Sequence, residues 1–250
     1  MEKNICLLII SISISILLIA VAISIYLLLK EKTIVETYDC FILSIFWPPN
    51  SCTNKYNKND ECFQRIKNLG IESDFIIHGL WPSPLSGEIP KSCNEGIKTE
   101  VIPNFDSDAE YKNKLEHIWP GLYSNDTYFW THEYNKHGFC YIKKMELDER
   151  DYEIYFNKTL DLFFENTMEN IIIEFYGHKD NGDYVLTDLK NKLDEKFGEN
   201  TYSLRCTKYG GYYYLSEIRF RLDMDFNLTT KGKSQNSCPT GQYIHVDYKS

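Results

Sequence analysis

The chain has 250 residues, of which 43% are hydrophobic, and its formal net charge is −9 at pH 7. This length allows one large domain or two small ones, and the hydrophobic share is sufficient for an ordinary core. The acidic balance excludes a basic stripe of the kind that holds long nucleic acid through counterion release. Any chemistry on nucleic acid must therefore depend on a local pocket or on protonated histidines.

The N-terminal segment 5–29 contains no charged side chain. As a helix it would be about 37 Å long at 1.5 Å per residue, which favours an uncleaved membrane anchor. The Ala-Val-Ala sequence at 20–22 instead resembles a signal-peptide cleavage site, so a cleaved signal peptide is the alternative. We expect 1–33 to be this leader and its junction, and 34–250 to be a domain in the secretory pathway, outside the cell or in a lysosome-like or vacuole-like lumen.

The cysteines agree with that route. Seven of the eight lie beyond the hydrophobic segment, and no two of them form a CxxC pair. This spacing argues against a zinc ribbon or a thioredoxin-like redox site and favours disulfides in an oxidising compartment, with one cysteine left over. Three N-x-T sequences give modest further support as candidate glycosylation sites, at Asn125, Asn157 and Asn227.

Strand and helix patterns are mixed along the rest of the chain. In the first half we expect a strand over 38–47 ended by Pro48-Pro49, a loop over 50–60 and a strand over 74–78. Three helices should follow, over 106–119, 132–137 (ended by Gly138) and 148–167, and then a short apolar run over 170–177. The last part should contain a helix capped by Thr187-Asp188 and ended by Gly198, a hairpin with arms 202–206 and 212–223 around Gly210-Gly211, and a strand over 242–248. Regular βαβ alternation is absent from this order. The pattern therefore predicts one α+β domain.

The segment 129–140 (Phe-Trp-Thr-His-Glu-Tyr-Asn-Lys-His-Gly-Phe-Cys) concentrates polar groups that are suited to catalysis. On a helix, the side chains of His132 and Lys136 would share one face, and those of Glu133 and His137 the next. An ordinary amphipathic helix could carry an incidental Glu–His pair. It does not need two histidines between tryptophan and cysteine, so the pattern indicates chemistry.

A second segment, 75–82 (Phe-Ile-Ile-His-Gly-Leu-Trp-Pro), places His78 near Trp81. A single histidine beside a tryptophan is more often a packed structural residue. Half of the six histidines in the chain, however, fall in these two segments. That concentration shifts the interpretation from packing to function.

Zinc binding is one alternative for the helical segment. A zinc-binding His-x-x-x-His pair places two imidazoles four residues apart on one helical face. Here His132 and His137 are five residues apart, about 140° on an α-helix, and Lys136 occupies the position of a ligand. The spacing disfavours zinc, and no cofactor is expected.

Cleavage of RNA by its own 2′-hydroxyl suits the same residues. This reaction needs a base for the hydroxyl proton, an acid for the leaving 5′-oxygen and positive charge near the phosphorus. Histidines can be the base and the acid, and a lysine adds charge. Trp81 and Trp130 could stack on the bases of single-stranded RNA. One histidine must be neutral and another protonated, so we expect an acidic pH optimum.

Segments 75–82 and 129–140 resemble the two active-site segments of the ribonuclease T2 family, as does the upstream Phe46-Trp47-Pro48 with Cys52 following. The resemblance extends over roughly 37–248. It implies an α+β fold with a central antiparallel sheet and flanking helices. It also implies a metal-independent endoribonuclease that forms a 2′,3′-cyclic phosphate and then a 3′-phosphate end.

The resemblance implies a role for each residue of the site. His137 would take the proton from the 2′-hydroxyl, and His78 would give a proton to the leaving oxygen. His132 would bind phosphate, while Glu133 and Lys136 would stabilise the transition state. We expect a monomer that acts on single-stranded RNA and meets a membrane only through its N-terminal segment.

The resemblance also implies a base-binding role for Trp81 and a set of disulfides. The family-like bridges are Cys52–Cys62, Cys93–Cys140 and Cys206–Cys238, which would leave Cys40 unpaired and buried. The chain departs from the family pattern at Phe46, Ser83, Tyr134 and Phe139. These departures remove no catalytic group, but they prevent any inference of base preference. A catalytically idle binding protein on the same fold remains the second hypothesis, against which the intact catalytic set argues.

Overall fold

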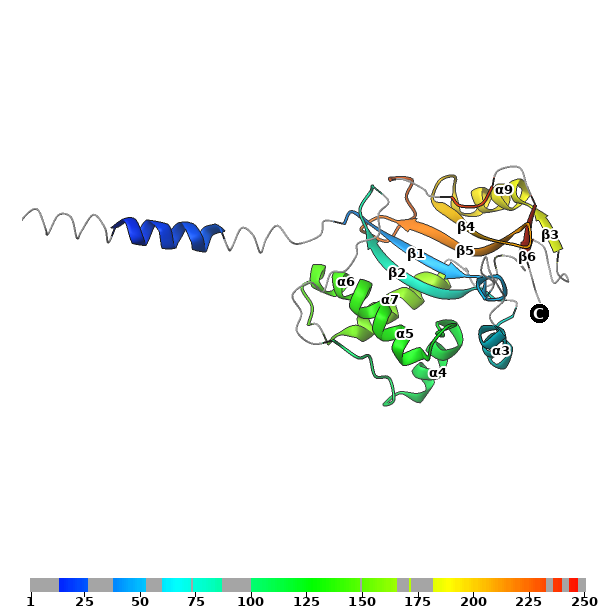
Figure 1. Cartoon of the computed structure of the whole chain (residues 1–250), viewed down its shortest axis with the longest axis horizontal. Coiled ribbons are helices and arrows are strands. Elements are labelled where there is room, and N and C mark those ends of the chain that lie inside the picture. The colour runs from blue at the N-terminus through cyan, green and yellow to red at the C-terminus, as the bar shows by residue number, and fades with distance from the viewer. Residues whose placement is uncertain are drawn as a thin grey trace, which may run out of the picture. The chain divides into compact units, whose positions relative to one another are not determined.

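The computed structural model describes residues 14–26, 38–52, 60–72, 74–86, 100–148, 150–165, 171, 182–232, 236–239 and 243–246. The chain divides into two compact units, Met1–Thr37 and Tyr38–Ser250. All the labelled helices and strands of Figure 1 belong to the second unit.

In the first unit, the described residues 14–26 form a helix. Across the described ranges, no helix is both long and apolar enough to cross a membrane. For these residues, the prediction of a transmembrane anchor over 5–29 is therefore wrong.

The second unit is built on one sheet. Its strands in the described ranges are β1 (Cys40–Phe46), β2 (Ile76–Ser83), β3 (Gly182–Val185), β4 (Tyr202–Tyr209), β5 (Tyr212–Leu222) and β6 (Tyr243–Val246). They follow the order β2-β1-β5-β6-β3, with β4 also paired to β5. The pairs β1–β2, β1–β5 and β4–β5 are antiparallel, so the predicted antiparallel sheet is confirmed.

Helices lie between the strands and flank the sheet (Figure 1), as predicted for an α+β domain. The described helices are α2 (Pro48–Ser51), α3 (Asp60–Leu69), α4 (Ala109–Ile118), α5 (Asp126–Glu133), the π-helix η1 (Tyr134–Gly138), α6 (Phe139–Lys144), α7 (Tyr152–Glu165) and α9 (Leu186–Phe197). Local signals explain several boundaries. The Asp108 side chain accepts from Tyr111 N at the start of α4, and α9 ends at Gly198 with φ +89°.

Several elements differ from the sequence-based expectation. The helix α3 and the strand β3 were not predicted. The helix α9 begins at Leu186, without a side-chain cap, rather than at the predicted Thr187-Asp188. By contrast, the predicted hairpin is confirmed, because Gly210 and Gly211 both have positive φ (+57° and +90°), as a tight turn between two strands requires. The apolar run at 170–177 lies outside the described residues except for 171.

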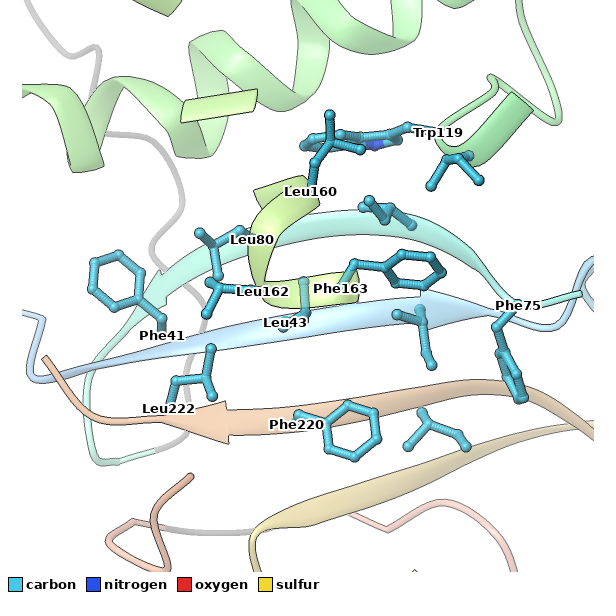
Figure 2. Packing of buried hydrophobic residues seen from close by; sticks show 14 of the residues in the cluster. Phe41, Leu43, Phe75, Leu80, Trp119, Leu160, Leu162, Phe163, Phe220 and Leu222 are labelled. Carbon is cyan, nitrogen blue, oxygen red and sulfur yellow. The ribbon is translucent and has the colours of Figure 1, made fainter. Parts of the chain in front are cut away.

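Alternate residues of the central strands form the core on one face of the sheet (Figure 2). Leu43 of β1, Leu80 of β2 and Phe220 of β5 are fully buried there. They pack with Phe163 of α7, and Phe220 also meets Phe197 of α9 at 4.8 Å between ring centroids. The remaining alternate positions of β1 and β5 belong to the other face of the sheet, where the active-site histidine of β2 is found.

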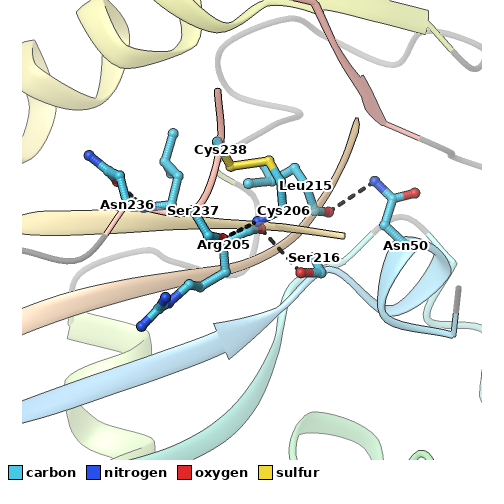
Figure 3. Close-up of a disulfide and its surroundings, with 9 residues drawn as sticks. Asn50, Arg205, Cys206, Leu215, Ser216, Asn236, Ser237 and Cys238 are labelled. Carbon is cyan, nitrogen blue, oxygen red and sulfur yellow. Dashed lines mark hydrogen bonds between the residues drawn. A yellow bond between two sulfur atoms is a disulfide. The ribbon is translucent and has the colours of Figure 1, made fainter. Parts of the chain in front are cut away.

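Two of the predicted disulfides are present, Cys52–Cys62 and Cys206–Cys238. Cys140 is disulfide-bonded as well, but its predicted partner, Cys93, lies outside the described residues. Cys40 is buried and forms no disulfide, as predicted. Figure 3 shows how Cys238 fastens its segment to β4, where Ser237 Oγ accepts from Cys206 N at 3.0 Å.

Candidate active site

His78 is the extra residue of a β-bulge in β2. In the pairing of β1 with β2, Ser44 lies opposite Gly79 and Ile45 lies opposite Ile77, so His78 falls between the paired residues. A bulge of this kind bends the strand and redirects a side chain, and such bulges often occur next to active sites. The strand was predicted to end at His78, but the pairing continues to the end of β2.

The bulge changes which side chains share a face of the sheet. Ile77 and Leu80 are three residues apart, yet both are fully buried in the core. His78 and Trp81, also three residues apart, meet edge-on at 4.7 Å between ring centroids. Regular alternation would place His78 and Trp81 on opposite faces. The bulge therefore brings both residues of the second sequence segment into one site.

Helical side chains cover the free edge of β2. Trp119 Nε1, at the end of α4, donates to the carbonyl oxygen of His78 at 2.9 Å. The Tyr155 hydroxyl of α7 donates to the carbonyl oxygen of Leu80 at 3.1 Å. These bonds satisfy backbone groups that an edge strand would otherwise leave exposed. They also fix the helical layer beside His78.

The catalytic segment forms one continuous helical stretch with a π turn in its middle, running from α5 through η1 into α6. Gly138 does not end the helix, so that prediction is wrong. Its lack of a side chain is required by packing instead, because a Cβ there would lie 2.6 Å from Tyr134 and 2.8 Å from Tyr155. The backbone bond from Phe139 N to Tyr134 O spans the five residues typical of a π turn.

The π turn also alters the relation between the two histidines of this segment. Residues five apart are separated by about one turn in π geometry but by more than one turn in an α-helix. His132 and His137 therefore lie closer to a common face than the 140° estimate predicted. Local π turns of this kind occur frequently at functional sites.

Glu133 is buried against the second active-site segment. Its Oε2 accepts a hydrogen bond from Trp81 Nε1 at 2.9 Å, and the residue is only 2% exposed. Burial raises the pKa of Glu133, against the opposing effects of the His78 charge and the Trp81 hydrogen bond. Gly79 makes this contact possible, because a Cβ at that position would overlap both Glu133 Oε2 and Trp81 Nε1.

His137 is buried beside the same tryptophan. Its ring lies 5.4 Å from that of Trp81 between centroids, and it is 3% exposed. Within the described part of the chain, its Nδ1 has no hydrogen-bond partner. Burial, followed by the charges of Lys136, His78 and His132, lowers the pKa of His137 to about 2. The ring is therefore neutral and can accept a proton.

Glu217 of β5 is a site residue that the sequence analysis missed. Its Oε1 lies 2.6 Å from Nδ1 of His78 and also accepts from the Ser44 hydroxyl. Its Oε2 accepts from Arg219 Nε at 2.8 Å and forms an ion pair with Arg219 Nη2 at 2.6 Å. Burial alone would raise the pKa of Glu217, but the hydrogen bond and charge of His78, with Arg219 and Ser44, lower it to about 2.

The signal for Glu217 in the sequence is weak. Glu217 and Arg219 alternate along a hairpin arm, a pattern that usually indicates a solvent-facing side of a strand. Only the register with β1, where Phe46 pairs with Glu217 and Ser44 with Arg219, brings them beside His78. Their position therefore depends on a pairing between segments more than 130 residues apart in sequence.

The remaining predicted residues have different environments. His132 is exposed on α5, and partial burial, then the charges of Lys136 and His78, lower its pKa. Trp130 is 2% exposed and donates through Nε1 to the carbonyl oxygen of Trp119 at 2.8 Å. Its predicted contact with the substrate stays a prediction.

Trp81 is also buried, at 3% exposed, and it contacts the rings of both His78 and His137. Its role in base binding stays a prediction. No cluster of three or more His, Cys, Asp or Glu side chains suited to a metal ion occurs among the described residues. The three candidate glycosylation residues, Asn125, Asn157 and Asn227, are exposed, and their modification stays a prediction.

Comparison with known proteins accounts for this arrangement. The family model for the ribonuclease T2 family matches residues 38–238. Ribonuclease 3 of Arabidopsis thaliana is 28% identical over 170 residues, which cover 67% of this chain and 70% of that protein. Ribonuclease T2 of Danio rerio is 24% identical over 210 residues, which cover 80% and 77%.

The fold is shared with solved structures as well. An RNase-related protein from Calystegia sepium superimposes with a TM-score of 0.62 at 20% identity, covering 85% of this chain and 98% of its own. The family match spans both histidine segments and the strand that carries Glu217. The chain therefore belongs to the ribonuclease T2 family and is an endoribonuclease.

Proposed function

We propose that the protein cleaves single-stranded RNA through its 2′-hydroxyl, with His137 as the base and His78 as the acid. The observation that supports this assignment most directly is that both rings lie against Trp81 but in opposite environments. His137 is buried among positive charges, whereas His78 is hydrogen-bonded to the carboxylate of Glu217. Two titratable groups held in such different environments are suited to opposite roles in proton transfer.

His137 suits the base. Its lowered pKa keeps the ring neutral at acidic and neutral pH, so a lone pair is available for the 2′-hydroxyl proton. Once it has taken that proton, the ring is an imidazolium against Trp81, whose Nε1 donates to Glu133. A nearby acidic group then stabilises the charge that the step creates.

His78 suits the acid. Its Nδ1 donates to Glu217 Oε1, which leaves Nε2 to exchange protons with the substrate. As the 2′-oxygen attacks phosphorus, the bond from phosphorus to the 5′-oxygen breaks, and the His78 proton goes to that oxygen. The product is a 2′,3′-cyclic phosphate. In the second step water attacks the phosphorus of the cyclic phosphate, and the bond from phosphorus to the 2′-oxygen breaks. The two histidines exchange roles in this step, and a 3′-phosphate results.

Lys136 and His132 would supply positive charge near the phosphorus. Both interact electrostatically with the catalytic pair, since Lys136 and His132 are among the charges that lower the pKa of His137. Fixed cations at that position stabilise the charge that develops on the phosphoryl oxygens. The residues of the chain thus provide base, acid and charge, and we propose that no metal ion is required.

An acidic pH optimum follows from these roles. The reaction needs neutral His137, which the lowered pKa permits at acidic pH, together with protonated His78. The chain has a net charge of −9 at pH 7, so protonation of carboxylates also reduces its repulsion of RNA. The disulfides are typical of an oxidising compartment of the secretory route. We propose that the protein acts there as a monomer.

The full-length protein, with its disulfides formed, tests this function. It is incubated with single-stranded RNA and with DNA of matching sequence at about pH 5, in excess chelator, and the product ends are identified. We expect cleavage of RNA alone, with cyclic phosphate appearing before 3′-phosphate. Loss of activity in chelator would contradict the metal-free mechanism. An inactive but folded protein would favour the idle binding protein.

A further inference from the structure

We propose that Glu217 is a positioning residue for the reaction: its carboxylate fixes the tautomer and ring orientation of His78, so that Nε2 faces the leaving 5′-oxygen. This inference rests on the proposed function and adds a residue on β5 to the two sequence segments on which that function was based. Glu217 acts through His78 and is not proposed to contact the substrate.

The first argument is the position of the carboxylate. Glu217 is 5% exposed, while the His78 side chain is 23% exposed, so the pair has a buried end and an accessible end. The hydrogen bond from Nδ1 to Glu217 Oε1 lies at the buried end, at 2.6 Å. Because one ring nitrogen is engaged there, the other is the one available to a substrate in the site.

The second argument is that the neighbouring rings restrict His78 without selecting a tautomer. Phe46 stacks on the imidazole at 3.9 Å between centroids, with an angle of 20° between the planes. Trp81 meets it edge-on at 4.7 Å. These contacts fix the plane of the ring, but an imidazole rotated by 180° would fill the same space. The hydrogen bond to Glu217 distinguishes the two orientations.

The third argument is that Glu217 is itself held in place. Arg219 Nε donates to Oε2, Arg219 Nη2 is ion-paired with the same oxygen, and Ser44 donates to Oε1. The Arg219 guanidinium also lies over the Trp81 ring, 4.9 Å from its centroid. Paired arginine and carboxylate groups with this geometry are strongly oriented. Arg219 therefore connects the carboxylate to the tryptophan that contacts both catalytic histidines.

Other charged groups surround His78, so the pH dependence has several contributors. The groups that interact electrostatically with His78 or with Glu217 are Arg219 on β5, His132 and Glu133 on α5, His137 on η1 and Tyr123 in the loop before α5. Lys136, also on η1, interacts with three of these groups, His132, Glu133 and His137. Among the described residues, Glu217 is the one with a hydrogen bond to the imidazole of His78. Its removal should therefore affect the protonated form of His78 most directly.

Glu217→Gln tests the proposal, because it keeps the size and an acceptor oxygen but removes the charge. Activity is measured on a dinucleoside phosphate, whose alkoxide leaving group needs an acid, and on a nucleoside 3′-(4-nitrophenyl phosphate), whose leaving group departs without a proton. We expect kcat/KM to fall about 10²-fold on the first substrate, the scale of a misplaced catalytic group, and only a few-fold on the second.

The variant should also shift the alkaline limb of the pH profile to lower pH, because the carboxylate no longer stabilises the imidazolium. Glu217→Asp, which keeps the charge on a shorter side chain, should restore part of the lost rate. Glu195→Gln makes the same change at an exposed position of α9 and should match the wild type on both substrates.

A purely structural role would lower the rate on both substrates equally, together with the melting temperature, and that result would overturn the proposal. Unchanged kinetics would overturn it as well. NMR of the wild-type protein gives a test independent of activity. We expect a retained Nδ1-bound proton on His78 at neutral pH, and a neutral ring protonated at Nε2 would contradict the proposal. If the wild type cleaves no RNA but shows the Nδ1 proton, the proposed function fails while the orientation of His78 by Glu217 stands.

Discussion

His78 and His137, for which we propose catalytic roles, show how the sheet and the helical layer place the same kind of side chain in different environments. His78 lies in a bulge of an edge strand, is partly exposed and donates to a buried carboxylate. His137 lies in a π turn, is 3% exposed and has no described partner for its Nδ1. The sheet therefore places its imidazole against a carboxylate, and the helical layer buries its imidazole among positive charges.

The comparison shows that an acid and a base can be made from one residue type by the choice of neighbours. Burial lowers the pKa of His137, whereas Nδ1 of His78 donates to the Glu217 carboxylate. Trp81 contacts both rings and donates to Glu133, so it lies between the two histidines and links them to the helical layer.

The largest expected effect comes from removing either histidine. His137→Phe and His78→Phe should each lower kcat on a dinucleoside phosphate by at least about 10²-fold, the scale of a lost acid or base. The two variants should differ on the nitrophenyl substrate, because only the base is still needed there. We expect His78→Phe to recover most of its rate on that substrate and His137→Phe to recover none.

Equal recovery in both variants would show that the two histidines do not have distinct roles. His117→Phe is the matched control, because His117 is an exposed histidine of α4 outside the site. Its kinetics should match those of the wild type on both substrates.

Substitution of Gly79 in the sheet or of Gly138 in the helical layer should have a smaller effect than loss of a histidine, because each glycine allows close packing. Gly79→Ala places a Cβ against Glu133 Oε2 and the Trp81 indole nitrogen, so it should lower activity about 10-fold or more by displacing the site. Gly138→Ala meets Tyr134 and Tyr155, and overpacking of this kind costs about 1–3 kcal/mol of unfolding free energy.

Steady-state kinetics and thermal unfolding of both glycine variants check this comparison. Gly70→Ala serves as a control for crowding, since no atom lies within 4 Å of a Cβ at that position, although its φ of +67° adds backbone strain. A Gly79→Ala variant with normal activity would show that the Glu133–Trp81 contact does not support the site.

Much of the fold could be predicted because it depends on local patterns. The alternation in β1, the Gly210-Gly211 turn and the capping residue Asp108 are each determined within a few residues. The membrane anchor over 5–29 was inferred from composition alone, and none of the described helices is both long and apolar enough to cross a membrane. Composition predicts hydrophobicity, but it does not fix the length of a helix.

The site was predictable only in part. The histidines, Glu133 and Lys136 were found because they are neighbours in sequence within recognisable segments. Three features were missed because they depend on long-range pairing or on a change of helical period, namely the bulge at His78, the π turn at Tyr134–Gly138 and the contact with Glu217. Periodic patterns assume regular elements, and these are the places where the elements are irregular.

The most direct test of the central claim is an NMR titration of the histidine side chains in the full-length protein between about pH 4 and 8, the range in which histidines normally titrate. The lowered pKa of His137, about 2, predicts that its ring stays neutral throughout this range. Signals are assigned from the His78→Phe and His137→Phe variants. A His137 ring that gains its proton near the ordinary histidine pKa of about 6.5 would contradict the account.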